Sequence, residues 1–240
     1  MRINKLLSNK GICSRKQTNV WIEAGRIQVN GKPAICGQWV EEEDEILLDG
    51  EPIKAREKVY LLLNKPVGIT CTADQNVKHN IIEYMAYPEF IFPVGRLDKD
   101  SQGLILMTND GDLANQILDA SYEHEKEYLV TVHKPFDESF LEKMANGVTI
   151  GNVMTRPCQI TRVSEDTFKI ILTQGLNRQI RKMCLTFGYK VIRLERIRIL
   201  FLQKENLPYG KWRPLTPEEI QRLQKMTYRA VEKYTDHNTQ

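Results

Sequence analysis

The sequence predicts an α+β protein with two domains. The first 48 residues show a pattern of two short helices followed by a tight hairpin, and from residue 58 onwards apolar strand candidates alternate with short helices. The chain has 240 residues, of which 41% are hydrophobic and 27% charged, which excludes a disordered or collagen-like chain. We therefore expect a small N-terminal domain, a linker and a larger domain, each with a buried core.

The N-terminal domain, expected at residues 1–48, begins with two helices. The first is predicted over residues 2–9. Ser14 is a suitable N-cap for a second helix over residues 15–24, because its hydroxyl can accept a hydrogen bond from a free backbone N–H of the first turn. Gly25 is placed to end that helix.

A tight hairpin is expected after these helices. Asn30-Gly31 stands between two extended stretches, and both residue types tolerate the positive φ of a two-residue turn. An acidic segment follows at residues 41–51, and residues 49–57 are expected to form the linker.

The larger domain is expected at residues 58–226. Short apolar runs predict strands, and amphipathic stretches between them predict helices. The expected strands lie at residues 59–64, 91–95, 103–108, 127–132 and 168–173, and the expected helices at residues 112–118 and 136–145.

Two further helical patterns close the chain. From Asn177 onwards, apolar residues recur at the spacing of one helix face, namely Ile180, Met183, Cys184 and Phe187. The string Thr216-Pro217-Glu218-Glu219 has the form of a capping box with proline in the first turn. Residues 227–240 are expected to form a frayed polar tail.

The chain carries no segment typical of export or membrane insertion. Its apolar runs are far shorter than the roughly 20 residues that a membrane-spanning helix requires. The N-terminal residues lack the continuous apolar stretch of a secretory signal. We therefore expect a cytoplasmic protein with no membrane contact.

Basic residues gather in two clusters, although the net charge is only +3. The first cluster lies within residues 1–32, is opposed only by Glu23, and comprises Arg2, Lys5, Lys10, Arg15, Lys16, Arg26 and Lys32. The second is opposed only by Glu195 and comprises Arg178, Arg181, Lys182, Lys190, Arg193, Arg196, Arg198 and Lys204. Two separate clusters favour a long polyanion such as nucleic acid, since each neutralised phosphate releases counterions. The alternative is a solvated charged surface.

The five cysteines are scattered, with no CxxC pair and no nearby histidine at the spacing of a metal site. We therefore expect reduced thiols and no metal ion. The chain also lacks a GxGxxG string and a Walker loop, so the sequence predicts no nucleotide cofactor.

The string from Val94 to Leu104 places Arg96, Asp98, Lys99 and Asp100 in a loop between two apolar strands. Charged loops on a sheet scaffold are common functional sites. A calcium loop is excluded, because its twelfth position is Asn109 instead of glutamate and residues 104–107 within it are strand-like. A divalent cation beside Asp98 and Asp100 is disfavoured by the two basic neighbours. An ion-paired surface loop is the remaining structural alternative.

Four motifs, which occur along the chain in the order of the family, resemble those of a known family of enzymes. GRLDKDSQGL at residues 95–104, HEKEYLV at residues 124–130, LTQGLNRQIRKM at residues 172–183 and LNKPVGI at residues 63–69 are similar to motifs of the small-subunit ribosomal type (RsuA family) of pseudouridine synthases. CSRKQ and WIEAGRIQVNG, within residues 13–31, resemble the S-four-type RNA-binding domain that precedes such catalytic domains. The resemblance covers about residues 2–225 and implies a mostly antiparallel mixed sheet with flanking helices and a central cleft.

The resemblance also implies roles for four residues. Asp98 matches the family's catalytic aspartate, which attacks C1′, attacks C6 or removes the 2′ proton. Arg181 matches the arginine that pairs with it, and Tyr128 the tyrosine that stacks on the extruded uracil and assists removal of the C5 proton. Arg96 matches the residue that fills the gap left by the flipped nucleotide, its structural alternative being an ion pair with Asp100. Lys99, Asp100 and Asp112 are interpreted as residues that order loops.

The implied substrate is RNA. Lys5, Arg15, Lys16, Arg26 and Arg178 are expected to contact phosphates, which position RNA without reading its sequence. The expected target is a uridine of large-subunit ribosomal RNA. The enzyme is expected to be a monomer. No cofactor is expected, because the isomerisation involves no oxidation, hydrolysis or energy input. Small-subunit ribosomal RNA, a tRNA anticodon uridine and a non-catalytic role in ribosome assembly remain as alternatives. The intact Asp98, Tyr128 and Arg181 disfavour the last.

Overall fold

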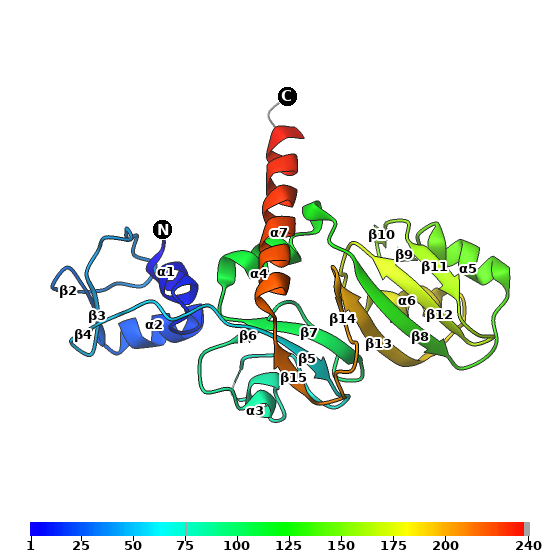
Figure 1. Cartoon of the computed structure of the whole chain (residues 1–240), viewed down its shortest axis with the longest axis horizontal. Helices are drawn as coiled ribbons and strands as arrows, with labels where there is room; N and C mark the ends of the chain where they lie inside the picture. The colour runs from blue at the N-terminus through cyan, green and yellow to red at the C-terminus, as the bar shows by residue number, and fades with distance from the viewer. Residues whose placement is uncertain (75, 238–240) are drawn as a thin grey trace.

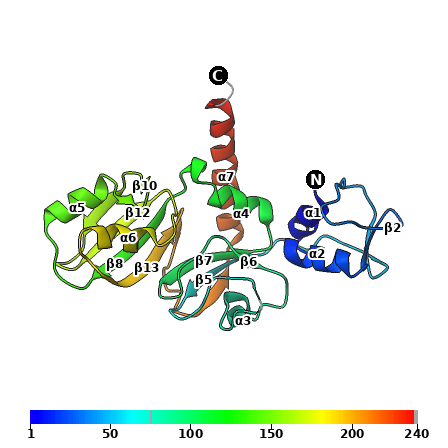
Figure 2. The ribbon, with the colours of Figure 1, turned by 180° about the vertical axis from the view of Figure 1, so that it is seen from behind.

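The computed structural model describes residues 1–74 and 76–237. A small N-terminal domain lies on one side of a central part that contains β5, β7 and β15, and a second lobe containing β8 and β12 lies on the other side (Figure 1). The view from behind shows the same arrangement (Figure 2). Within the described residues, no helix has the length and apolar character needed to cross a membrane.

The two expected N-terminal helices are present as α1 (Ile3–Asn9) and α2 (Arg15–Glu23). The backbone N–H of Gln17 donates to Ser14 Oγ at 3.1 Å, so the predicted N-cap is confirmed. Strands β1 (Ile27–Val29) and β2 (Lys32–Pro33) form the expected hairpin. Asn30 and Gly31 between them have φ of 49° and 76°, the left-handed conformation that the turn requires.

The N-terminal sheet extends further along the chain than expected. Strand β3 (Ile46–Leu48) pairs antiparallel with β1, and β4 (Glu51–Pro52) pairs with β3. Ile53 packs against the same hydrophobic core. The first residues of the segment expected as a linker, 49–57, therefore belong to this domain. In the sequence, the short apolar run of β3 is flanked by acidic residues, which made the segment look like part of a solvated connection.

The larger domain is built on a mixed sheet with the strand order β11-β12-β8-β13-β7-β5-β15, in which β6 also pairs with β7 and β14 with β13. Strand β13 pairs with β7 in parallel, and the other neighbours along the described sheet pair antiparallel. The expected mostly antiparallel mixed sheet is therefore confirmed. Its strands are β5 (Tyr60–Lys65), β6 (Phe92–Pro93), β7 (Gln102–Thr108), β8 (Lys126–Val132), β11 (Gln159–Arg162), β12 (Thr167–Leu172), β13 (Val191–Ile199), β14 (Leu202–Gln203) and β15 (Trp212–Pro214). A separate hairpin consists of β9 (Thr149–Ile150) and β10 (Val153–Met154).

The parallel contact between β7 and β13 requires a glycine. Gly103 faces Arg196 across the pair and has φ of 109°. A Cβ atom at this position would lie 2.3 Å from the backbone oxygen of Arg196 and 2.5 Å from its nitrogen. The glycine near the end of the GRLDKDSQGL string is therefore explained by close backbone approach, which joins the two lobes directly behind the loop that carries Asp98.

Alternating side chains of the central strands enter two different cores. Leu62, Leu104 and Leu106 face α4 (Gly111–Leu118) and α7 (Pro217–His237), whereas Leu63 and Ile105 face α3 (Ile81–Met85). The second lobe has its own core, in which Phe168 and Met183 are fully buried. That core is covered by α5 (Glu138–Ala145) and α6 (Gln179–Thr186). A short 3-10 helix, η1 (Ala120–Tyr122), connects the two halves of the sheet.

The last helix differs from expectation. Its start is as predicted, because Glu219 N donates to Thr216 Oγ1 at 3.2 Å and Thr216 N donates to Glu219 Oε2 at 2.8 Å, which is a complete capping box. The helix then continues to His237. The polar tail expected at residues 227–240 therefore begins inside this helix, since no glycine or proline interrupts residues 218–237, and residues 238–240 lie outside the described residues.

The N-terminal domain contacts the larger domain at one turn. Asn109 accepts a hydrogen bond from Val59 N and donates one to the Glu57 carbonyl, both at 2.8 Å. A Cβ on Gly11 would lie 2.8 Å from Asn109 Nδ2, so α1 ends directly against this turn. Asn9 Nδ2 donates to Asp112 Oδ2 at 2.9 Å, which shows Asp112 bonding across the domain boundary.

Candidate active site

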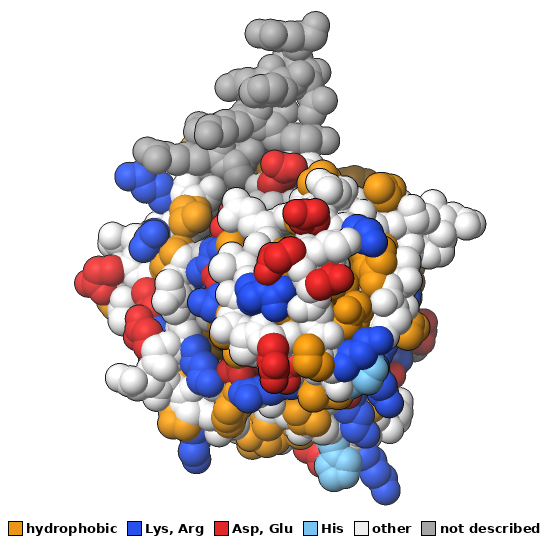
Figure 3. All heavy atoms as spheres, turned by 90° about the vertical axis from the view of Figure 1, so that its right-hand side faces the viewer, with side chains coloured by type: hydrophobic (Ala, Val, Ile, Leu, Met, Phe, Trp, Pro, Cys, Tyr) orange, Lys and Arg blue, Asp and Glu red, His pale blue; other side chains and the backbone are white. Residues whose placement is uncertain are grey.

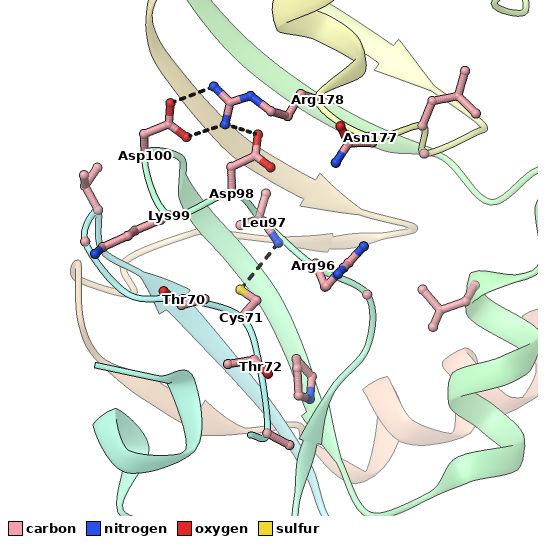
Figure 4. A pocket seen from close by; sticks show the side chains of 18 residues that line it. Thr70, Cys71, Thr72, Arg96, Leu97, Asp98, Lys99, Asp100, Asn177 and Arg178 are labelled. Atoms are coloured by element: carbon pink, nitrogen blue, oxygen red, sulfur yellow. Dashed lines mark hydrogen bonds and ion pairs between the residues drawn. The ribbon is translucent and has the colours of Figure 1, made fainter. Parts of the chain in front are cut away.

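A cleft of about 1230 Å³ opens between the two lobes of the larger domain. Its walls are formed by residues 67–73, by the loop that contains Arg96 and Asp98, and by residues 175–178 (Figure 4). A smaller pocket of about 110 Å³ shares Arg96, Asp98 and Arg178 with this cleft and adds Tyr128 to them. The structure therefore brings the predicted Asp98 and Tyr128 to one pocket.

Asp98 sits in a tight loop between β6 and β7. Ser101 N donates to the Asp98 carbonyl at 3.0 Å, and Leu97 N donates to Cys71 Sγ at 3.4 Å on the other side (Figure 4). These bonds fix the backbone on both sides of the aspartate. Its side chain is 28% exposed, so it lines the cleft without facing open solvent.

A buried lysine supports this loop from behind. Lys65 is fully buried at the end of β5, and its Nζ donates to the carbonyls of Ser101 at 2.8 Å, Pro66 at 2.9 Å and Asp98 at 3.4 Å. Burial lowers the pKa of Lys65, while the nearby Asp98 and Asp100 oppose that effect. Lys65 is a residue of the site that was not predicted from the sequence. The sequence feature that could have identified it is a lysine at the end of an otherwise apolar run.

Arg181 lies beside Asp98 but is held mainly by other groups. Its Nε is 3.9 Å from Asp98 Oδ2, an ion pair beyond hydrogen-bond distance. Its Nη2 donates to the Asp100 carbonyl at 3.0 Å and to Ser101 Oγ at 3.1 Å, and its Nη1 donates to the Val191 carbonyl at 3.1 Å. With only 13% of its side chain exposed, Arg181 is a fixed positive charge behind the aspartate.

Arg178 forms the shorter contact with Asp98. Its Nη1 lies 3.4 Å from Asp98 Oδ2, and the same guanidinium makes two hydrogen bonds to Asp100, each 3.1 Å long (Figure 4). These hydrogen bonds are the largest cause of the lowered pKa of Asp100, with Arg181 contributing further. Asp100, which the sequence analysis interpreted as ordering the loop, is thus an ion-pair partner of both arginines.

Tyr128 reaches the pocket from the middle of β8. Tyr128 pairs with Ile170 of β12 and with Arg196 of β13, so β8 is flanked by a strand on each side at this residue. Its ring packs against the cores of both lobes. This position gives the pocket an aromatic wall whose ring is held from two sides.

Arg96 is exposed and lines both the cleft and the smaller pocket. Among the described residues it makes no hydrogen bond or ion pair, and Asp100, its structural alternative partner, is taken by Arg178. Within the residues that the structure describes, no group of three His, Cys, Asp or Glu side chains is close enough together to hold a metal ion.

The first basic cluster lies on the N-terminal domain. Arg15 and Lys16 are exposed in the first turn of α2, and Lys5 is partly buried on α1. Lys16 contributes to lowering the pKa of Asp74, after the hydrogen bond from Asn76 N. Arg26 is also exposed but pairs with Asp49.

The second basic cluster is different from what we expected. Arg196 is only 3% exposed and donates through Nε to the Leu104 carbonyl at 2.6 Å. Arg198 pairs with Glu127 at 2.8 Å and Glu125 at 3.0 Å. The buried Glu195 pairs with Arg193 at 2.8 Å and Lys204 at 2.9 Å.

The expected second phosphate-binding cluster is therefore wrong for these four cations. Arg196 is buried against the Leu104 carbonyl, and the other three are paired with Glu125, Glu127 or Glu195. The outer end of this lobe likewise shows Lys and Arg interspersed with Asp and Glu among the residues drawn in colour (Figure 3).

Comparison with known proteins agrees with this geometry. Residues 59–186 match a family model described as RNA pseudouridylate synthase, and residues 1–46 match the S4 domain. The chain is 47% identical over 223 residues to the dual-specificity RNA pseudouridine synthase RluF of Escherichia coli strain K12, covering 92% of this chain and 77% of that protein. It is 33% identical over 231 residues to the ribosomal large subunit pseudouridine synthase B of Bacillus subtilis strain 168, covering 92% and 95%.

A solved pseudouridylate synthase has the same fold. It superposes with a TM-score of 0.68 at 28% identity, covering 93% of this chain and 99% of that one. The expected S-four-type domain, the synthase domain and the RNA substrate are confirmed by these matches. The family match over more than half of the chain, together with relatives at 47% and 33% identity, shows that this protein belongs to the RNA pseudouridylate synthases, in the RsuA family, and isomerises uridine in RNA.

Proposed function

We propose that the enzyme acts on a uridine of large-subunit ribosomal RNA and that Asp98 carries the chemistry. The observation that supports this assignment is the pocket in which Asp98 and Tyr128 meet, with guanidinium groups 3.4 Å and 3.9 Å from Asp98 Oδ2. The name of the Bacillus subtilis relative, ribosomal large subunit pseudouridine synthase B, supports the ribosomal target.

The reaction breaks the bond between N1 and C1′, turns the uracil and joins C5 to C1′. A carboxylate can attack an electron-poor carbon or remove a proton, and the two guanidinium groups offset the negative charge of Asp98 when RNA excludes water. Attack on C1′, attack on C6 and removal of the 2′ proton all use the same carboxylate. Lysine in place of Arg181 would retain the charge but lose the planar set of donors that bonds three acceptors at once.

The pocket requires the uridine to leave its stack. Asp98 lies in a cleft between two lobes, which a base inside a helix cannot enter. We propose that Arg96, exposed at the cleft and without a partner among the described residues, fills the gap left by the flipped nucleotide. Tyr128 stacks on the extruded uracil, and its hydroxyl assists removal of the C5 proton.

The cost of flipping, a few kcal/mol, must be offset by contacts elsewhere on the RNA. We assign this role to Lys5, Arg15, Lys16 and Arg26 on the N-terminal domain and to Arg178 at the cleft. Exposed Arg15 and Lys16 are best placed for phosphates. We also propose that the enzyme acts as a monomer, and a ribosomal substrate supports the expected cytoplasmic location.

A second RNA substrate is a specific alternative. The words "dual-specificity" in the name of the Escherichia coli relative favour more than one RNA target. Small-subunit ribosomal RNA and the tRNA anticodon are the candidates, because the site has no feature that distinguishes between them and large-subunit RNA.

The experiment incubates the purified protein with unmodified transcripts of both ribosomal RNAs and of a tRNA set, and maps pseudouridine in each. We expect conversion of a small number of uridines in large-subunit RNA, with none in reactions without protein. Conversion confined to tRNA or small-subunit RNA would overturn the target while keeping the chemistry. Tight RNA binding without any pseudouridine would favour the non-catalytic assembly factor.

A further inference from the structure

Asp98, Asp100 and Arg178 lie together at the cleft, and Arg181 lies behind the two carboxylates. Arg178 gives Asp100 two hydrogen bonds of 3.1 Å, one from each Nη, and gives Asp98 a single contact of 3.4 Å (Figure 4). A two-point guanidinium–carboxylate pair is stronger and more directional than a one-point contact. In this arrangement the stronger pair is made with the residue that has no assigned role in the reaction.

The consequence for Asp98 concerns its two oxygens. The contacts with Arg178 and Arg181 both involve Oδ2. Among the described residues, no hydrogen bond is made to Oδ1. A carboxylate needs at least one oxygen free of strong donors to attack carbon or take a proton, because a guanidinium that binds both oxygens blocks both.

Arg178 is the group that could close over Asp98. Its side chain is 43% exposed, and Nη1 is already 3.4 Å from Oδ2. Arg181 has no such freedom, because two backbone carbonyls and Ser101 Oγ hold it in place. Without a competing carboxylate, Arg178 would be expected to turn and make its two-point pair with Asp98.

We propose that Asp100 is a positioning residue that binds the Arg178 guanidinium at two points and thereby keeps Oδ1 of Asp98 free for the reaction. This inference rests on the proposed role of Asp98. It assigns Asp100 a function that a residue ordering the loop would not have, since its effect passes through Arg178.

The test measures single-turnover pseudouridine formation with enzyme in excess over RNA, so that weaker binding does not limit the rate. We expect Asp100→Asn to react about tenfold more slowly, because a neutral amide competes poorly with Asp98 for a guanidinium. Asp100→Glu restores the carboxylate and should recover most of the loss. Asp100→Ser, which removes the carboxylate with a smaller side chain, should behave as Asp100→Asn does. RNA affinity and the unfolding temperature of each variant are measured on the same preparation.

The decisive variant is the double substitution Asp100→Asn with Arg178→Met, which also removes the guanidinium. We expect it to react faster than Asp100→Asn alone, although it binds RNA less tightly. A double variant as slow as the single one, or slower, would show that Asp100 only orders the loop and would overturn the proposal. A wild-type rate in Asp100→Asn would overturn it as well, because the reaction would then not depend on the pairing of Asp100 with Arg178. Failure of the proposed function is distinguishable, because the wild-type enzyme itself would then form no pseudouridine.

Discussion

The two clusters of basic residues look alike in the sequence and are used differently in the structure. In the N-terminal domain, Arg15 and Lys16 are exposed. In the second lobe, Arg196 is buried and Arg198 is paired with two glutamates. The difference lies in the secondary structure: the first pair stands on the first turn of a surface helix, whereas the second pair belongs to an internal strand of the sheet.

This comparison shows that local charge density does not identify an RNA-binding surface. Partners of the strand cations come from far along the chain, since Arg198 pairs with Glu127 and Glu125 of the neighbouring β8 region. A cation that is neutralised inside the fold releases no counterion when RNA binds. The N-terminal cluster should therefore determine RNA affinity, and the strand cluster should determine stability.

The largest effect is expected from Arg196→Ala. The substitution removes a fully enclosed side chain and its hydrogen bond to the Leu104 carbonyl, so the free energy of unfolding should fall by about 3 kcal/mol. Denaturant unfolding measures this change. The slope of log RNA affinity against log salt should stay unchanged in the folded variant. A lower slope without loss of stability would contradict this prediction and would show that Arg196 contacts RNA.

The next effect concerns Lys126, whose pKa is lowered to about 8, chiefly by burial and further by Arg196. Below pH 8 this lysine is charged in both the folded and the unfolded protein, and burial of the charged ammonium group destabilises the folded protein. Between pH 8 and about 10.5 only the unfolded chain keeps the proton, so the free energy of unfolding of the wild type increases as the pH rises.

Lys126→Met should therefore raise the free energy of unfolding at pH 7 by about 1 to 2 kcal/mol, after allowing for the lost hydrogen bond to the His124 carbonyl. The gain should shrink as the pH rises from 8 towards 10.5. Denaturant unfolding at several pH values tests this, with the exposed Lys143→Met as control. A gain that does not depend on pH would contradict the assigned cause.

A third effect is expected on RNA binding. The double substitution Arg15→Ala and Lys16→Ala should lower the slope of log affinity against log salt by about 1.4, if each side chain neutralises one phosphate. Stability should change little, because both side chains are exposed. The control is Lys134→Ala with Lys143→Ala, two exposed residues of the second lobe. Equal slopes for the two double variants would remove the distinction between the clusters.

The smallest effect is expected from Arg26→Ala. Arg26 is exposed, pairs with Asp49 and lies 5.5 Å from the centre of the Trp21 ring, so its charge is already partly neutralised. Its removal should change the salt slope by less than that of Arg15. Asp49→Asn should strengthen RNA binding by freeing the guanidinium. A full unit of slope lost on Arg26→Ala would show that RNA displaces Asp49.

The sequence predicted the elements whose signals are local. Ser14 and the Asn30-Gly31 turn are where the pattern placed them, since capping and turn chemistry involve only neighbouring residues. Strand β13 was read as a basic cluster. Register shifts after Val191 and after Arg196 break the alternation of buried and exposed side chains that marks a strand.

For the site, the sequence named candidate residues but not their contacts. Asp98, Tyr128 and Arg181 were predicted through the family resemblance, and the structure places the first two in one pocket. The competition between Asp98 and Asp100 for Arg178 could not be predicted, because it depends on distances between a loop and a helix start that lie about 80 residues apart. Lys65 was missed for the same reason.

The account depends most on Asp98, and its most direct test is release of tritium from RNA that carries 5-labelled uridine. Wild-type enzyme should release the label as C5 becomes bonded to C1′. Asp98→Asn should release none above background, although it folds and binds RNA. The matched control is Asp166→Asn, which lies in the remote turn between β11 and β12 and should release label at the wild-type rate. Equal release by Asp98→Asn and the wild type would contradict the account.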